Sequence, residues 1–244
     1  MRYNFILFSF LMAVSLASIN VNGAADRHKR LKVFRCLRAM PVDLFLLQET
    51  HLADFTQGKA WEKEWRGGGQ CTWSPGSNRS AAVAVLNHPN SAAKLVDSKT
   101  DLAGRVVTAL IDFHGQRFQI INVYGPNKHR ERELFFDNLW RFKYQNIEAI
   151  VVGDFNCVPD ITLDKWGGDD SFGDRAVTQL HSFTATLALE DFFSVSNPRG
   201  RIFTWFKVAR LDFLGGIPPK FERQLRRRES VSYTHLTLPT KRIV

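Results

Sequence analysis

Apolar and polar positions follow one another along the chain in patterns that predict helices and strands in mixed order. Near-helical spacing of apolar residues predicts an amphipathic helix over Asp26–Met40, which Pro41 ends. Continuous apolar runs predict buried strands over Val42–Gln48 and Ala149–Gly153. Further strands are predicted over Ala81–Leu86, Arg105–Phe113, Arg117–Val123, Phe203–Phe206 and Arg210–Leu214, and further helices over Glu131–Phe142 and Asp174–Leu189.

One pair of these strands is joined by a tight turn. His114 and Gly115 lie between Arg105–Phe113 and Arg117–Val123, a spacing typical of a β-hairpin. Strands that alternate with helices, with a hairpin among them, predict an α/β fold of two packed mixed sheets flanked by helices. A chain of 244 residues with 44% apolar content is long enough for one sizeable core, so we expect one domain.

The two ends of the chain differ from its middle. Phe5–Ala17 is a largely apolar run, too short for a transmembrane helix. Two interpretations of it remain open: a secretory signal peptide, or a first core strand over Ala13–Asn20 after a translated leader. From Gly215 onward no period continues the fold. We therefore expect an apolar leader over 1–12, the domain over 13–214 and a non-native tail over 215–244.

The charge of the chain suits a polyanionic partner only weakly. The net charge is +9, and Lys or Arg contacts to phosphates strengthen binding by releasing counterions. However, seven Lys or Arg and two Asp or Glu lie from Gly215 to Val244, which leaves +4 for the rest. Cys36, Cys71 and Cys157 form neither a metal-spaced cluster nor an even disulfide set, which is typical of a reducing compartment.

Polar side chains follow the predicted strands where those strands end. Asn20 and Asn22 follow the first, and alternation puts both on one side, where they either hold a metal or phosphate or form a turn closed by Gly23. Glu49 lies just after the apolar run Leu44–Leu47. It is either a ligand for a hard cation such as Mg²⁺ or a solvated strand-end residue.

A third strand end and two further positions add candidates. Asp154 and Asn156 follow a buried run, where Asp154 could deprotonate water and Asn156 could donate to a phosphate. Tyr124 lies at a strand exit and Asp212 near the end of the last predicted strand. Taken singly, Tyr124 is more often a packing residue and Asp212 a strand-end charge than a functional residue.

The order and spacing of the motifs are more specific than any one of them. The chain contains, in order, SINVNG, LLQETHL, NVYGP, VVGDFN, LEDFF, NP, FTW and RLD. Between Ser15 and Leu214 this series resembles the endonuclease/exonuclease/phosphatase family. Within that family it is similar to the apurinic-like endonuclease domain of non-LTR (LINE-type) retrotransposons rather than to lipid phosphatases or secreted deoxyribonucleases.

The resemblance implies a fold, an activity and partners. The implied fold is a four-layer α/β sandwich of two packed mixed β-sheets flanked by helices (a DNase I-like fold), with its last strand missing here. The implied activity is Mg²⁺-dependent nicking of DNA, with Mn²⁺ as a substitute, leaving a 3′-hydroxyl for target-primed reverse transcription. The implied partners are DNA and the reverse transcriptase domain of the same element, for a nuclear monomer with no membrane contact. The alternatives are a secreted DNase-like phosphodiesterase with residues 1–17 as a signal, or a degenerate non-catalytic fragment.

The resemblance also assigns roles to single positions. The implied metal ligands are Asn20, Glu49 (the main one), Asp154 and Asn156. The implied catalytic residues are Tyr124 on the scissile phosphate, Asp154 activating water, Asn156 holding the transition state and Asp212 orienting a histidine. The implied DNA contacts are Asn78, Arg79, Asn127, Thr204 and Trp205.

The chain departs from the family pattern at three places, and one of them changes these expectations. Ala82 stands where the family has glycine and Ser194 where it has arginine, and neither is decisive. The family's closing Ser-Asp-His is absent, because His235 follows Tyr-Thr in a stretch that resembles translated sequencing-adapter DNA. We therefore expect the genuine protein to end between Asp212 and Ser230, and the chain as written to nick DNA very slowly or not at all.

Overall fold

The computed structural model describes residues 6–9, 14–65, 69–77, 81–158, 175–189, 191 and 212–216. A first sheet has the strand order β1-β2-β3-β5-β4 and consists of β1 (Ile6–Ser9), β2 (Ser15–Asn20), β3 (Leu44–Gln48), β4 (Cys71–Ser74) and β5 (Val83–Asn87). A second has the order β10-β9-β8-β7-β6 and consists of β6 (Lys94–Thr100), β7 (Val106–Phe113), β8 (Gln116–Tyr124), β9 (Ala149–Asp154) and β10 (Asp212–Gly216). The helices are α1 (Arg27–Arg38), α2 (Phe55–Trp65), α3 (His129–Asp137), the 3₁₀ turn η2 (Leu139–Phe142) and α5 (Arg175–Thr186).

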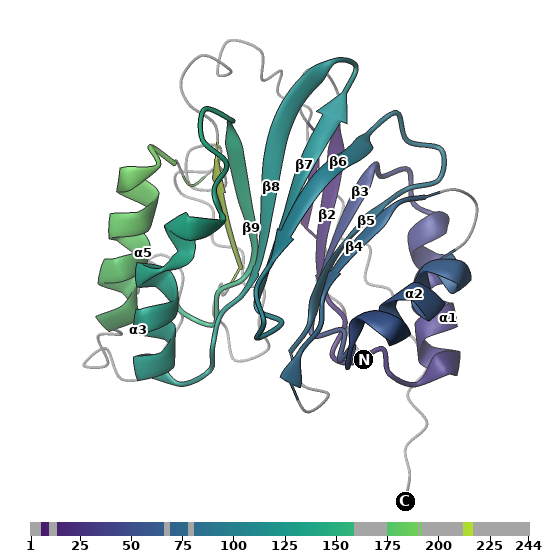
Figure 1. The fold of residues 1–244 in the computed structure, drawn as a ribbon, viewed down its shortest axis with the longest axis horizontal. Helices are drawn as coiled ribbons and strands as arrows, with labels where there is room; N and C mark the ends of the chain where they lie inside the picture. Colours follow the sequence, from purple (N-terminus) through teal and green to yellow (C-terminus); the bar gives the residue numbers. More distant parts are fainter. Residues whose placement is uncertain are drawn as a thin grey trace, which may run out of the picture.

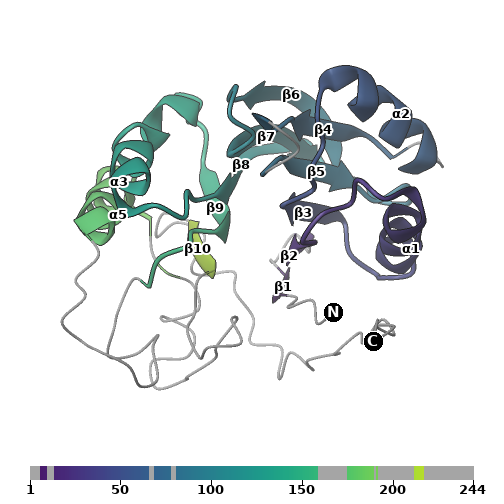
Figure 2. The ribbon, with the colours of Figure 1, turned by 90° about the horizontal axis from the view of Figure 1, so that it is seen from below.

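The two sheets pack face to face between two helical layers. Figure 1 shows α1 and α2 on one outer face and α3 and α5 on the other, and the view from below in Figure 2 gives the same order of layers. Buried side chains form one cluster between the sheets, which includes Leu16, Leu44 and Ile120. Each sheet also has one cluster of buried side chains between it and the helices on its outer face. The predicted four-layer α/β sandwich is therefore confirmed.

Strand direction brings several strand ends to one edge. β2 runs parallel to β3, and β8 runs parallel to β9. Because parallel strands end at the same edge of a sheet, the residues after these four strands are neighbours in pairs. β10 pairs antiparallel with β9, with Asp212 opposite Asp154. The packing of one sheet on the other then brings both pairs together.

Local sequence accounts for the elements that were predicted. α1 begins after Asp26, whose side chain accepts a hydrogen bond from the backbone nitrogen of Lys29 at 2.7 Å, and it ends before Pro41. His114 and Gly115 have φ of 52° and 81°, the left-handed conformations of a type I′ hairpin turn, so the predicted hairpin is confirmed.

Two predicted elements differ in detail from those observed. The helix predicted over Glu131–Phe142 is interrupted at Asn138, where α3 gives way to η2. The strand predicted from Ala81 starts only at Val83, because Ala81 and Ala82 have φ of 56° and 66°. The left-handed conformation at position 82 is one that glycine adopts freely, which explains the glycine of the family pattern.

Four elements were not predicted, and each has a weak local signal. α2 contains Gly58 and packs through Trp61 and Trp65 rather than through aliphatic residues. β4 has only four residues, and β6 is a largely exposed edge strand without alternation. β1 lies in the segment expected to be a leader and pairs antiparallel with β2.

The described part of the chain contains no helix with the length and apolar character needed to cross a membrane.

β10 covers Asp212–Gly216, two residues beyond the strand end predicted at Leu214. The strand predicted over Phe203–Phe206 lies outside the described residues.

Candidate active site at the carboxyl edge of both sheets

Five of the residues singled out in the sequence lie together where the four parallel strands end. Asn20 ends β2, Glu49 follows β3, Tyr124 ends β8, Asp154 ends β9, and Asn156 comes two residues later. Hydrogen bonds join them into one cluster that spans the two packed sheets. The sequence separations within the cluster reach 134 residues, so only the tertiary fold can assemble it.

Asn20 connects the two carboxylates of the cluster. Its Nδ2 donates to Oε1 of Glu49 and to Oδ2 of Asp154, each at 3.0 Å. Its own Oδ1 accepts a hydrogen bond from the backbone nitrogen of Asn22 at 2.9 Å, which fixes the orientation of the amide. One oxygen of each carboxylate therefore lies within hydrogen-bond distance of a single atom.

Tyr124 adds a hydroxyl donor to the same carboxylate. Its hydroxyl donates to Oε1 of Glu49 at 2.6 Å, and the Arg105 guanidinium lies 4.8 Å from the centre of its ring. Burial, followed by the hydrogen bond to Glu49 and the charges of Glu49 and Asp154, raises the pKa of Tyr124 well above its usual value, against the opposing effect of Arg105. Tyr124 therefore keeps its proton at neutral pH and acts as a hydrogen-bond donor.

Asp154 is a buried carboxyl held by two donors. Burial raises its pKa to about 6, and the nearby charge of Glu49 adds to this rise. The hydrogen bonds from Asn20 and from the backbone nitrogen of Asn156, at 3.0 Å each, oppose it. A cation beside both carboxylates would offset the burial and the repulsion that disfavour the ionised form of Asp154.

The donor set fits a hard divalent cation. The structure, over the residues it describes, contains no group of three or more His, Cys, Asp or Glu placed to hold a metal. Mg²⁺, however, commonly takes only one or two carboxylates from a protein and completes its shell with water and substrate phosphate. Glu49 and Asp154, joined through Asn20, provide that number of carboxylates.

The backbone around the cluster is unusually strained. Glu49 and Asn156 have φ of 51° and 50°, in the left-handed region that costs an L-residue roughly 1–2 kcal/mol. Gly125 and Gly153 permit close backbone approaches, since a Cβ at these positions would lie 2.3 Å from the Phe155 carbonyl oxygen and 1.9 Å from that of Val123. Left-handed and crowded backbone of this kind is frequent at functional sites.

Like Arg105, two further basic side chains beside the cluster were not predicted as site residues. Nε2 of His51 lies 4.0 Å from Oε2 of Glu49, and Nζ of Lys29 donates to the backbone oxygen of Asn22. Burial lowers the pKa of Lys29, while the charges of Glu49 and Asp26 act in the opposite direction. His51 belongs to the QETH motif, but Lys29 was counted on the polar face of a helix, and no local pattern marks it out.

The backbone conformation of Asn22 and the side-chain partner of Asn156 differ from what the sequence predicted. β2 ends at Asn20, and Asn22 is exposed with φ of 45°, so the strand alternation on which the expectation of one shared side rested does not continue to Asn22. The alternative, a polar turn closed by Gly23, is confirmed by the bond from Asn22 to Asn20 and the φ of 84° at Gly23. Nδ2 of Asn156 donates to the Gly125 carbonyl at 2.8 Å, so its amide holds the backbone here.

The remaining predicted positions are only partly described. The backbone of Asp212 lies opposite that of Asp154 in the β9–β10 pair. Asn127 is exposed in the loop before α3, and its carbonyl accepts a hydrogen bond from Arg132 at 3.0 Å. Asn78, Arg79, Thr204 and Trp205 lie outside the described residues.

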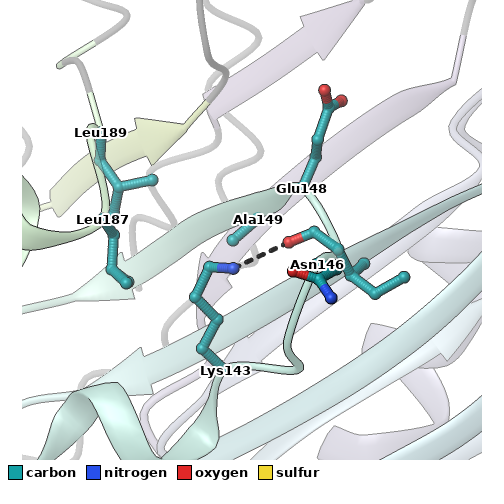
Figure 3. A pocket seen from close by; sticks show the side chains of 7 residues that line it. Lys143, Asn146, Glu148, Ala149, Leu187 and Leu189 are labelled. Carbon is teal, nitrogen blue, oxygen red and sulfur yellow. Dashed lines mark hydrogen bonds between the residues drawn. The ribbon is translucent and has the colours of Figure 1, made fainter.

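A shallow pocket lies away from this cluster, at the opposite end of β9. It has a volume of about 250 Å³, and Figure 3 shows Lys143, Glu148 and Leu187 among the side chains that line it. Nζ of Lys143 is engaged by the backbone oxygens of Tyr144 and Ile147, at 3.2 and 3.0 Å. The charged residues in this lining are Lys143, whose Nζ is occupied by backbone oxygens, and Glu148, so the strand-end cluster, which joins two carboxylates and a phenol, remains the candidate site.

Comparison with solved structures shows the same fold in several nucleases. The AP endonuclease from Archaeoglobus fulgidus is 21% identical, with a TM-score of 0.67 over 86% of this chain and 88% of that one. The APE2 catalytic domain of Xenopus laevis is 16% identical, with a TM-score of 0.64 over 82% of this chain and 81% of that one. The 3′ phosphatase NExo from Neisseria, bound to product DNA hairpin, is 21% identical, with a TM-score of 0.66 over 84% and 87%.

Sequence comparison adds a relative and a family. The transposon TX1 uncharacterized 149 kDa protein of Xenopus laevis is 26% identical over 204 residues, or 81% of this chain. The matched part is 15% of the length of that protein. The sequence model of the endonuclease/exonuclease/phosphatase family matches residues 17–215, a range that contains every strand-end residue of the cluster. The chain is therefore a member of the endonuclease/exonuclease/phosphatase family.

Proposed function

We propose that the chain is the endonuclease part of a larger non-LTR retrotransposon protein and nicks DNA in a Mg²⁺-dependent reaction. The nick would leave a 3′-hydroxyl from which the reverse transcriptase domain of the same element begins synthesis, which places the protein in the nucleus. The relationship to a transposon protein supports this origin, and the relative bound to a product DNA hairpin supports DNA as the substrate class.

The observation that carries the proposal is the cluster of Asn20, Glu49, Tyr124 and Asp154 at one edge of both sheets. Glu49 and Asp154, with Asn20 between them, would hold the Mg²⁺ ion, which when bound neutralises charge that develops on the phosphate. Tyr124, which keeps its proton, would turn the hydrogen bond that it donates to Glu49 toward a phosphate oxygen. Asp154 orients the attacking water and accepts its proton.

Asn156 has a supporting part in this proposal. Its backbone nitrogen donates to Oδ1 of Asp154 at 3.0 Å and so holds the carboxyl in place. Its side-chain amide, bonded to the Gly125 carbonyl, would have to exchange that partner in order to contact a phosphate. Asp212, whose backbone pairs with that of Asp154, is placed by the resemblance beside a histidine that the sequence does not supply in a Ser-Asp-His motif.

The test is the conversion of supercoiled plasmid to the nicked circle with Mg²⁺ and with EDTA. Two proteins are compared: the chain as written, and the same chain extended by a strand that ends in Ser-Asp-His. Loss of one acid–base group removes roughly 10² to 10⁴ in rate, so the extended chain should nick faster by about that factor. If the extended chain, properly folded, nicks no faster in Mg²⁺ than in EDTA, the proposed function is wrong.

A further inference from the structure

The turn between β6 and β7 exposes a leucine at the same edge as the candidate site. Leu102 is 97% exposed, more than any other large apolar side chain that the structure describes. β7 runs antiparallel to β8 with Val106 opposite Val123, so this turn lies beside the end of β8, where Tyr124 is. Three residues after Leu102, Arg105 contacts the ring of Tyr124 and donates to the Gly125 carbonyl at 3.2 Å.

Hydrogen bonds hold this turn in one conformation. Oδ1 of Asp101 accepts from the backbone nitrogens of Arg105 and Val106, at 2.9 and 3.0 Å, and from the Ser74 hydroxyl at 2.7 Å. The turn therefore closes on itself and is tied to the end of β4. Leu102 is held out into solvent by an ordered backbone.

A close backbone contact adds to this order. Gly104 has φ of 68°, and a Cβ on it would lie 2.5 Å from the Cα of Gly76. The loop that contains Gly76 is in turn tied to the residues after β3, because the backbone nitrogen of Gly76 donates to the Leu52 carbonyl at 3.0 Å. The turn is thus fixed to the loop that follows β4 and, through it, to the segment that carries Glu49 and His51.

We propose that Leu102 is an apolar wedge that enters a base step of duplex DNA bound at the candidate site. This inference rests on the proposed function. Proteins that bend DNA insert apolar side chains, leucine among them, between base pairs and partly unstack them. A wedge on an ordered turn loses little conformational entropy on insertion, and insertion removes a fully exposed leucine from water.

The test measures binding by the full chain in EDTA, so that it does not depend on cleavage. The probe is a short fluorescein-labelled duplex that carries 2-aminopurine, whose fluorescence rises when the base unstacks. Leu102→Ala should bind about tenfold more weakly, as expected for loss of most of one buried leucine, and should abolish the rise in fluorescence. The matched control is Leu134→Ala, since Leu134 is 67% exposed on α3 in the outer helical layer; it should bind like the unaltered chain.

The outcomes separate this inference from the proposed function. If the unaltered chain does not bind the duplex while the extended chain nicks plasmid in Mg²⁺, only the wedge is overturned; if neither occurs, both are overturned. If it binds, and Leu102→Ala gives the same affinity and the same 2-aminopurine signal, only the wedge is overturned. Sedimentation of both proteins tests whether Leu102 instead contacts a second copy of the chain. If Leu102→Ala removes self-association without any change in DNA binding, Leu102 belongs to a contact between protein chains, and the wedge is overturned.

Discussion

The side chain of Asn20 donates a hydrogen bond to the carboxylate of Asp154 across the packed sheets, with Nδ2 and Oδ2 3.0 Å apart. Asn20 ends β2 of the first sheet, and Asp154 ends β9 of the second. A site that spans two sheets is complete only when the sheets are docked, so its properties respond both to substitution of the site residues and to substitution of the residues that align the sheets.

Glu49→Gln distinguishes a metal ligand from a structural residue. Glutamine keeps the volume of the side chain and an oxygen that accepts from Tyr124, but it removes the charge. In the chain extended by Ser-Asp-His, the Mg²⁺ concentration for half-maximal nicking should rise by about tenfold or more, since a carboxylate ligand is lost. The melting temperature in EDTA should stay the same or rise, because an unneutralised charge is removed.

The opposite pattern would identify a structural glutamate. In that case the melting temperature would fall, and the Mg²⁺ midpoint of nicking would not move. Measurement of both quantities on the one variant therefore decides between the two roles, and an unchanged midpoint removes Glu49 from the proposed metal site.

Asp154 makes the stability of the metal-free protein depend on pH. Its pKa rises from 3.8 to about 6 on folding, so the folded state binds a proton more tightly than the unfolded state does. By linkage, this residue's contribution to the free energy of unfolding falls as pH rises from about 4 to about 6. Urea titrations in EDTA should show this decline for the unaltered chain and a weaker decline for Asp154→Asn.

Mg²⁺ should reverse this effect. A bound cation favours the ionised carboxyl, so it should stabilise the unaltered chain more at pH 7 than at pH 4. Asp154→Asn should show a smaller response to Mg²⁺ at pH 7. Equal Mg²⁺ responses of the two proteins at pH 7 would contradict the placement of Asp154 beside the metal, and nicking by Asp154→Ala at the unmutated rate in the extended chain would contradict its role on water.

Asn122 is expected to stabilise the packing of the sheets. From β8 it donates to the carbonyls of Leu47 and Ala84 in the first sheet, at 3.0 and 2.9 Å, and it accepts from Nε2 of Gln48 at 2.7 Å. All of these groups are buried, so Asn122→Leu leaves two carbonyls without this donor. The free energy of unfolding should fall by about 3–5 kcal/mol in urea denaturation. A loss below about 1 kcal/mol would show that these bonds do not matter to the packing.

His114→Asn should stabilise the protein without affecting the site. His114 occupies a left-handed position of the β7–β8 turn, and asparagine followed by Gly115 is strongly preferred there. The gain should be at most about 1 kcal/mol, seen as a higher urea midpoint. The turn precedes the first residue of β8, whereas Tyr124 is its last, so the nicking rate of the extended chain should not change. A change in that rate would mean that the two ends of β8 are coupled.

Much of the fold could be predicted because its elements have strong local signals. α1 has a capping aspartate and an apolar face, and β3 and β9 are continuous apolar runs. α2 and β6 could not be predicted, because the first packs through tryptophans and the second is an exposed edge. Their structure comes from the tertiary contacts that they make rather than from period or propensity.

The site could be predicted as separate strand ends but not as a cluster. Asn20 and Glu49 each had a plain alternative when taken singly, and only the family resemblance joined them to Asp154. Their convergence depends on parallel pairing within each sheet and on packing between sheets, neither of which is encoded near any one of them. Arg105 and Lys29 were missed as neighbours of the site for the same reason, since nothing adjacent to them in sequence marks their position.

The buried bonds of Asn122 have a consequence for how a chain with this fold changes in evolution. They align the two sheets from within, two residues before Tyr124 along β8 and beside Gln48, which precedes Glu49. In the turn that carries Leu102, Arg105 contacts the ring of Tyr124, whereas the side chain of Leu102 is 97% exposed. Substitutions of Leu102 itself can therefore accumulate without displacing the carboxylates, and under the proposed function the contacts made with DNA can diverge while the arrangement of the strand-end cluster is inherited intact.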